Sequence, residues 1–130
     1  MIDITEKYIG KEWTQEYDCV SLAREVLLNE FCKEPPMPDN MDWKHTSVQD
    51  MKDLAKGHAV EIEEPKTGDL ALMRILGSKR CLGSHIGVVF IVNHQVWILH
   101  NLERIGVLFQ STYNLVRNNL EVVAYYQVNE

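Results

Sequence analysis

The chain has 130 residues, a formal net charge of −6 at pH 7 and 45% hydrophobic residues. This length fits one domain with an ordinary buried core, so we expect a single domain over residues 1–130. The acidic balance argues against sequence-independent binding of DNA or RNA, which requires a basic surface. No apolar run approaches the ~20 residues that cross a membrane. We therefore expect no nucleic-acid partner and no membrane insertion.

The N-terminal sequence MIDITEKYIGKEW has no basic segment followed by an apolar core, so it does not predict a secretory signal peptide. Three cysteines are too few, and odd in number, for a disulfide framework, and they suit synthesis in a reducing compartment. Cys19, Cys32 and Cys81 also form no close C-x-x-C pair, which structural zinc sites usually show. We expect no metal site and no cofactor.

Helical patterns dominate the first part of the chain. Apolar residues recur there at helical spacing, namely Val20, Ala23, Val26, Leu27 and Phe31. This spacing predicts an amphipathic helix that begins near Cys19 and ends near Phe31. Residues 33–43 form a predicted loop, because a cluster of prolines prevents both a helix and a central strand. Residues 46–57 read as a short helix with a Ser/Thr start and a glycine stop.

After Gly68 the pattern changes to that of β-strands. The predicted strands cover residues 69–75, 85–92, 95–100, 106–110 and 121–128. The second of them is β-branched and apolar on both faces, which predicts a central strand covered on both sides. Helices followed by an antiparallel meander of about five strands indicate the α+β class.

One predicted hairpin decides whether two histidines can meet. A two-residue turn at residues 93–94 would place Gly87 opposite His100, with His85 as the diagonal neighbour of His100 on the same face. A three-residue turn would shift the register by one and put the histidines on opposite faces. The pairing is conditional on that turn, and the alternative is two ordinary histidines at strand ends.

Cys19 occupies the first turn of the predicted helix, where the helix dipole lowers the pKa of a thiol. With His85 as the base and His100 as the residue that orients the base, these side chains would form a nucleophile–base–orienter arrangement. A cysteine can instead simply pack on an apolar helix face. Cys81, beside two basic residues, is a weaker second candidate for a nucleophile.

Four segments follow the order and approximate spacing of one known family. They are YDCVSLAREV, PKTGDLALMR, SHIGVVF and VWILHNLE. In turn they resemble the Asp-Cys helix start, the Pro-x-x-Gly-Asp-Leu strand, the His-x-Gly strand and the second-histidine strand of the NlpC-type (NlpC/p-sixty) cysteine peptidases. That papain-like family cleaves peptidoglycan stem peptides. The similarity extends from Ile9 to Tyr126.

The resemblance implies a papain-like α+β fold with N-terminal helices packed on a C-terminal sheet. It implies Cys19 as the nucleophile, His85 as the base and His100 as the orienting residue of a Cys-His-His triad. Within the family the chain is most similar to the branch found in bacteriophage tails, on the segments YIGKEW, SLAREV, LHNLERIGVLFQ and VVAYYQ. A virion protein of this kind would be made in the host cytoplasm without a signal peptide and would act in the host cell envelope. Its substrate would be a peptidoglycan peptide, and its partners would be other tail-tip proteins.

The chain departs from the family pattern in the loop before Cys19. Family members usually carry a glycine-rich loop there, whereas KEWTQEYDC has no glycine after Gly10. A tyrosine in that region often helps to hold the oxyanion. Trp13 occupies the nearest matching position, and Tyr17 and Asp18 are further candidates for oxyanion or substrate contacts. The Cys19 backbone N–H remains as one donor.

The expected function is thus a cysteine peptidase or amidase that acts on peptidoglycan stem peptides. Two alternatives stay open. The short loop before Cys19 motivates a structural tail-tip or assembly protein with the same fold and little activity. A papain-like acyltransferase acting on lipids or small amides would need an apolar acyl-binding groove, and no long exposed apolar segment supports one.

Overall fold

The computed structural model describes residues 4–34, 47–76 and 84–128 of the chain. Its strands form one six-stranded antiparallel sheet in the order β1-β6-β2-β3-β4-β5. The strands are β1 (Ala59–Ile62), β2 (Leu70–Ile75), β3 (Ser84–Val92), β4 (Gln95–Leu102), β5 (Gly106–Ser111) and β6 (Leu120–Val128). The helices are α1 (Ile4–Lys7), α2 (Cys19–Phe31), α3 (Val48–Ala55) and the 3-10 helix η2 (Leu115–Asn118).

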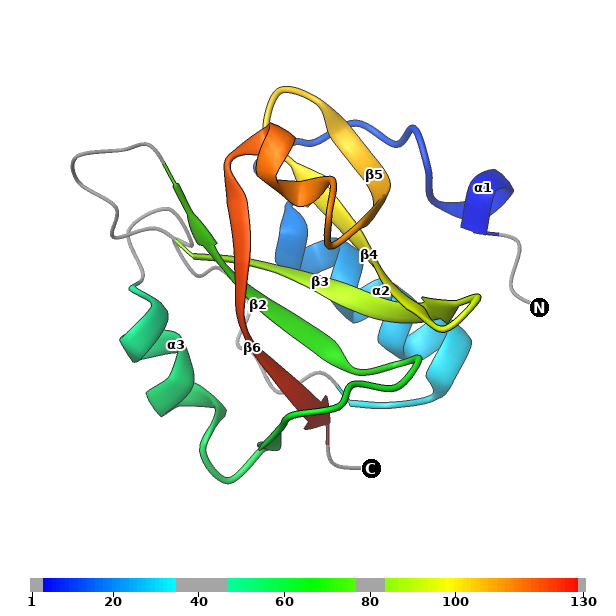
Figure 1. The fold of residues 1–130 in the computed structure, drawn as a ribbon. Helices are drawn as coiled ribbons and strands as arrows, with labels where there is room; N and C mark the ends of the chain where they lie inside the picture. Colours follow the sequence, from blue (N-terminus) through cyan, green and yellow to red (C-terminus); the bar gives the residue numbers. More distant parts are fainter. Residues whose placement is uncertain (1–3, 35–46, 77–83, 129–130) are drawn as a thin grey trace.

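This architecture confirms the predicted α+β class and corrects the predicted meander (Figure 1). The sheet has six strands rather than about five, and β6 lies between β1 and β2, so only β2 to β5 form a meander. β1 is not among the predicted strands, because its four residues are largely exposed and show no clear alternation. The pairing of β6 with β1 and β2 joins strands that are distant in sequence, and no local sequence pattern predicts it.

Both predicted helices are present, as α2 and α3. The predicted loop at residues 33–43 lies outside the described residues from residue 35 onward, and so does Cys81. Within the described ranges, none of the helices combines the length and apolar content needed to cross a membrane.

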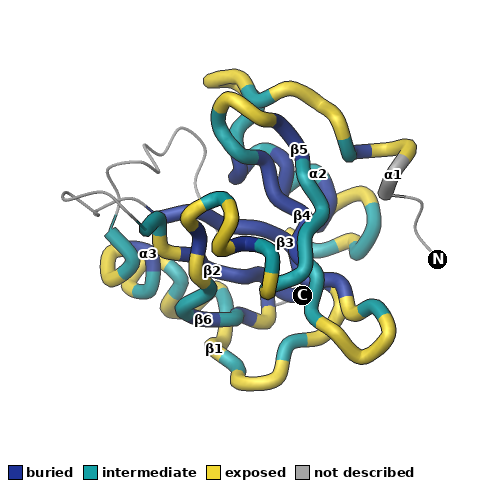
Figure 2. Tube along the Cα trace, turned by 45° about the horizontal axis from the view of Figure 1, so that its top comes forward, coloured by how far each residue is buried: buried dark blue, intermediate teal, exposed yellow. Residues whose placement is uncertain are grey.

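The sheet carries an apolar cluster on each face. On one face the core joins α2 to β2, β3 and β4, and Figure 1 shows α2 behind the sheet. On the other face a smaller cluster includes Leu115 of η2 and Leu120 of β6. β3 is buried over its first seven residues, visible as dark blue tube in Figure 2. The prediction of a central strand covered on both sides is therefore confirmed.

α2 begins at Cys19 because Asp18 caps it. One carboxylate oxygen of Asp18 accepts the backbone N–H groups of Val20 and Ser21, each at 3.0 Å. These bonds satisfy two of the donors that the first turn of a helix leaves unpaired. The cap thus fixes Cys19 as the first residue of the helix, as the sequence predicted.

The hairpin between β3 and β4 has the predicted two-residue turn. Asn93 and His94 have positive φ angles of 51° and 66°, as a type I′ turn requires. The strands pair without a register shift from this turn as far as Val88 opposite Leu99, and Gly87 and His100 are the next residues on the two strands. A Cβ added to Gly87 would lie 3.1 Å from the Cβ of His100. The predicted register is confirmed.

Candidate functional site

His85 and His100 are in direct contact. His85 Nε2 lies 2.9 Å from His100 Nδ1, and the rings meet edge to face with centroids 5.0 Å apart. Both side chains are buried. The pairing that the hairpin made conditional is therefore present, and a hydrogen bond links the predicted base to the predicted orienting residue.

The Gln110 amide, oriented as the structure has it, gives a direction to the hydrogen bonds through His100 and His85. Gln110 Oε1 lies 2.9 Å from His100 Nε2 and also accepts from Asn118 Nδ2 at 3.1 Å. Because a carbonyl oxygen can only accept, a neutral His100 carries its proton on Nε2 and presents a lone pair at Nδ1. His85 must then donate from Nε2, which leaves the lone pair of His85 on Nδ1.

Burial favours the neutral form of both imidazoles. It lowers the pKa of His100 to about 4, although the hydrogen bond to Gln110 acts in the opposite direction. Burial also lowers the pKa of His85 well below its ordinary value, and repulsion between the two rings when both are protonated lowers it further. A neutral His85 can accept a proton at Nδ1, as a general base must.

Cys19 and His85 line the same cleft, which has a volume of about 800 Å³. The cleft lies where β3 begins and β4 ends. Its walls also come from the segment before α2, from the turn between β4 and β5, and from η2. Arg104 and Arg117 add positive charge to these walls. The predicted nucleophile and the predicted base thus open onto one space that a ligand can enter.

The predicted lowering of the Cys19 pKa is wrong for this structure. Burial raises the pKa of the Cys19 thiol to about 12. A hydrogen bond between the thiol and the backbone of Ile86 lowers this pKa, and the negative charge of Asp18 raises it. The position at the helix N-terminus is as predicted, but the unfavourable burial of a thiolate outweighs the stabilisation found there. The resting site therefore holds a neutral thiol.

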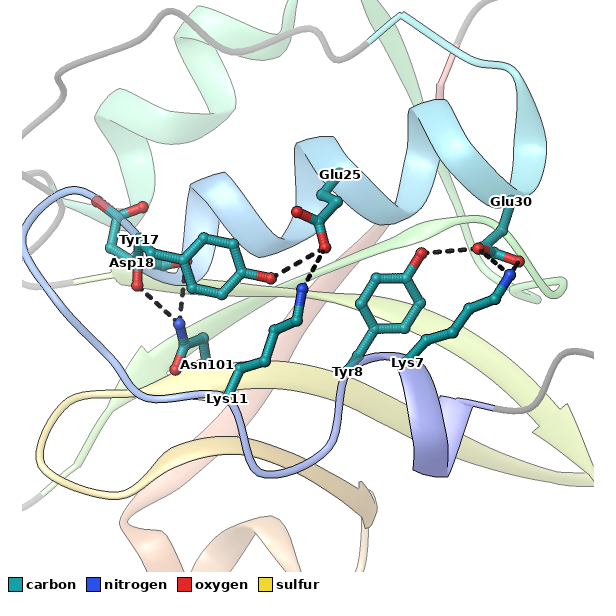
Figure 3. A network of polar contacts seen from close by, with 8 residues as sticks. All are labelled: Lys7, Tyr8, Lys11, Tyr17, Asp18, Glu25, Glu30 and Asn101. Carbon is teal, nitrogen blue, oxygen red and sulfur yellow. Dashed lines mark hydrogen bonds and ion pairs between the residues drawn. The ribbon is translucent and has the colours of Figure 1, made fainter.

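Polar contacts hold the segment before Cys19 along α2 (Figure 3). The Tyr8 hydroxyl donates to Glu30 at 2.7 Å, and Lys11 pairs with Glu25 at 3.0 Å. Individual ion pairs of this kind contribute little to stability when exposed. Together, however, they attach the segment to the helix whose first residue is the candidate nucleophile, and the segment forms one wall of the cleft.

The three predicted oxyanion or substrate contacts lie in different environments. Trp13 and Asp18 line the cleft, but the Asp18 carboxylate is occupied as the cap of α2. The Tyr17 side chain runs along α2, where its hydroxyl donates to Glu25 at 3.3 Å (Figure 3). Trp13 and the Cys19 backbone N–H remain the candidates for an oxyanion contact.

Sequence reasoning missed four polar residues that the structure places around these groups, namely Ser84, Asn101, Gln110 and Asn118. The sequence could have indicated Gln110. In the register between β4 and β5, Gln110 is the diagonal neighbour of His100 on the same face of the sheet. Asn118 comes from η2, which no local pattern indicates. For Ser84 and Asn101, the only indication in the sequence is that each is adjacent to one of the two histidines.

A comparison with protein-family models finds no family that matches this chain, and a comparison with curated proteins finds no matching sequence. The resemblance to NlpC-type peptidases therefore stays a prediction. In the part of the chain that the structure describes, no three His, Cys, Asp or Glu side chains are grouped so that they could hold a metal ion. The site brings together one thiol, two imidazoles, one hydroxyl, several amides and two guanidinium groups.

Proposed function

We propose that this protein is a cysteine peptidase or amidase that hydrolyses amide bonds in the peptide part of peptidoglycan. The observation that carries the proposal is the directed chain of hydrogen bonds from Gln110 through His100 to His85, which lines a cleft together with Cys19. It leaves a lone pair on the imidazole that opens onto the same space as the thiol. The resemblance of the four sequence segments to NlpC-type peptidases supports the choice of a stem peptide as the substrate.

In the first step a thioester forms. Cys19 Sγ attacks the carbonyl carbon of the scissile amide while the thiol proton passes to His85 Nδ1. Because burial raises the pKa of Cys19 to about 12, attack and proton transfer occur together rather than from a preformed thiolate. The Cys19 backbone N–H and the Trp13 indole N–H donate to the oxyanion. His85 then protonates the leaving amine as the C–N bond breaks.

Water completes the reaction. His85 Nδ1 takes a proton from the water, whose oxygen attacks the thioester carbonyl carbon. The C–S bond breaks, the acid leaves, and the proton returns to Cys19 Sγ. His100 and Gln110 are positioning residues in this scheme. They hold His85 in one orientation and one tautomer, and the lone pair at His100 Nδ1 stabilises the imidazolium that forms on His85.

The proposed setting is the tail tip of a bacteriophage. The similarity of several segments to the tail-associated branch of the NlpC-type peptidases supports this placement. The chain is acidic, with a net charge of −6, and is therefore not attracted to an anionic wall polymer by charge alone. Other tail-tip proteins would bring it to the cell wall, where it would open peptide cross-bridges or stems.

Cleavage of isolated stem peptides tests the proposal. Wild-type protein is incubated with peptidoglycan peptides, and mass spectrometry detects new amino and carboxyl ends. We expect cleavage by the wild type and a loss of at least about 10³-fold in Cys19→Ala, because the nucleophile is gone. His58→Gln is the matched control, since His58 is exposed and outside the cleft, and it should cleave at the wild-type rate. Equal cleavage by wild type and Cys19→Ala would overturn the proposal.

One observation favours a second candidate, a structural tail-tip protein with little activity. Burial holds the Cys19 thiol neutral, with a pKa of about 12, as expected of a cysteine that only packs. This candidate predicts that the wild type leaves every stem peptide intact and that Cys19→Ala assembles into tails as well as the wild type does.

A further inference from the structure

Two residues that line the cleft each have a buried polar atom with no hydrogen-bond partner among the described residues, namely Ser84 Oγ and Asn101 Oδ1. The two residues are 2% and 0% exposed, and both line the cleft with Cys19 and His85. Buried polar groups in folded proteins are nearly always paired, because an unpaired one keeps the full penalty of its lost hydration. Two such atoms in residues that line one cleft point to a ligand that pairs with them.

The orientation of the Asn101 amide follows from its other end. Asn101 Nδ2 donates to the backbone carbonyl of Tyr17 at 2.8 Å and lies 3.5 Å from that of Asp18 (Figure 3). Carbonyl oxygens only accept, so the nitrogen and the oxygen of the Asn101 amide cannot exchange places. Oδ1 is therefore a fixed acceptor, and a ligand must bring an N–H or an O–H to it.

Ser84 complements this fixed acceptor. Its hydroxyl can donate as well as accept. Ser84 precedes the base His85 at the start of β3, and Asn101 follows His100 on β4. The two unpartnered atoms thus belong to the immediate sequence neighbours of the histidine pair, and together they offer one acceptor and one donor to a ligand.

We propose that Ser84 and Asn101 form an amide-binding floor of the cleft. Asn101 Oδ1 accepts an amide N–H of the ligand, and the Ser84 hydroxyl donates to an amide carbonyl oxygen. The ligand class is a peptide-like amide, since an ester or an acyl chain has no N–H to offer. This inference rests on the proposed function in one respect, because its test uses Cys19 as the reacting group beside the floor.

The test compares two small thiol reagents. 2-Iodoacetamide carries an amide, whereas methyl methanethiosulfonate carries none. Mass spectrometry follows the rate at which each reagent modifies Cys19 and separates Cys19 from the other cysteines. The rate for each reagent is then divided by the rate at which the same reagent modifies free cysteine. The ratio of the two normalised rates cancels any change in thiol ionisation that affects both reagents. The variant is Ser84→Ala, and the control is Ser111→Ala at the end of β5, outside the cleft.

We expect the ratio to favour 2-iodoacetamide in the wild type and to fall about 2- to 10-fold in Ser84→Ala, the range of one neutral hydrogen bond. It should be unchanged in Ser111→Ala. Ser84→Ala should fold normally, because it removes only a hydroxyl that has no hydrogen-bond partner among the residues that the structure describes. An unchanged ratio in Ser84→Ala would overturn the inference, as would a Cys19 that reacts with neither reagent, since the floor would then be closed to ligands.

The result of this test can be distinguished from the result of the stem-peptide cleavage test. If the wild type cleaves no stem peptide but the ratio falls in Ser84→Ala, the floor stands and the peptidase proposal fails. If the wild type cleaves stem peptides and Ser84→Ala keeps both its cleavage rate and its reagent ratio, the peptidase proposal stands and the floor is wrong.

Discussion

Gly87 of β3 packs closely against His100 of β4, and the structure leaves no room for a larger residue between them. A Cβ at Gly87 would contact Ile98 Cγ2 and would lie 2.9 Å from the carbonyl oxygen of Leu99 and 3.1 Å from the Cβ of His100. The neighbouring strands could therefore not keep their present spacing. The glycine thus permits the close approach on which the contact between His85 and His100 depends.

Gly87→Ala should accordingly destabilise the protein by about 1–3 kcal/mol, as overpacking of a tight core does. The free energy of unfolding, measured by urea titration, checks the size of the effect. Amide hydrolysis should fall as well, because a shift of β4 moves His100 relative to His85. If Gly87→Ala has wild-type stability and activity, the close pairing that the structure gives is incorrect.

The tautomers of the two histidines are a separate prediction. The Gln110 carbonyl oxygen requires the proton of His100 to sit on Nε2, and His85 must then carry its own on Nε2 as well. ¹⁵N NMR of the imidazoles at pH 7 should show both rings neutral and in the Nε2–H form. In Gln110→Leu, His100 loses its acceptor, so we expect a loss of about 1–3 kcal/mol in stability. Nδ1–H signals from either ring of the wild type would contradict the chain of bonds.

Stability should decline in mildly acidic solution because of the buried histidines. Both have a lowered pKa when folded, about 4 for His100, against about 6.5 in an unfolded chain. The folded state therefore binds fewer protons than the unfolded state between these values. The free energy of unfolding then falls as pH drops from about 6.5 toward 4, by roughly 1 kcal/mol per pH unit for each histidine.

A comparison of variants separates this effect from the titration of carboxylates in the same range. His100→Gln should show a shallower decline than the wild type between pH 6.5 and about 4.5, because it removes one of the two buried imidazoles. His58→Gln, at an exposed position, should keep the wild-type slope. Equal slopes in wild type and His100→Gln would show that His100 titrates normally.

Asp18 has two effects on Cys19 that substitutions can separate. Its carboxylate caps α2, and its negative charge raises the pKa of the thiol. Asp18→Asn should keep the cap and lower the Cys19 pKa, whereas Asp18→Ala should lose the cap and about 1 kcal/mol of stability. Thermal unfolding measures the loss of the cap, and the alkaline part of the pH dependence of Cys19 alkylation measures the pKa of the thiol. A higher Cys19 pKa in Asp18→Asn would show that the charge is not felt at the thiol.

Much of the fold follows from local sequence. The apolar spacing after Cys19 predicts α2, and the two-residue turn at 93–94 predicts the register that joins His85 to His100. The place of β6 beside β1 does not follow, because the two strands are distant in sequence and β1 is short and exposed.

The candidate site is less completely predictable. The residue types and their positions, at the start of α2 and on β3 and β4, single out Cys19, His85 and His100 as candidates, but they do not predict the ionisation of these side chains. The helix N-terminus suggests a lowered pKa for Cys19, and only the tertiary structure shows how deeply the thiol is buried. The same is true of Asn118, which reaches Gln110 from a 3-10 helix that has no clear sequence signal.

The most direct test of the central claim, that Cys19 and His85 act as a pair, is the rate of Cys19 alkylation by iodoacetamide against pH in wild type and His85→Ala. The account predicts that the wild-type rate rises through an inflection below pH 6.5, where His85 becomes able to accept the thiol proton. In His85→Ala the rate at pH 7 should be at least about tenfold lower and should rise only in alkaline solution, where a buried thiol ionises. The same profile in both proteins, with a rise only at alkaline pH, would contradict the pairing of Cys19 with His85.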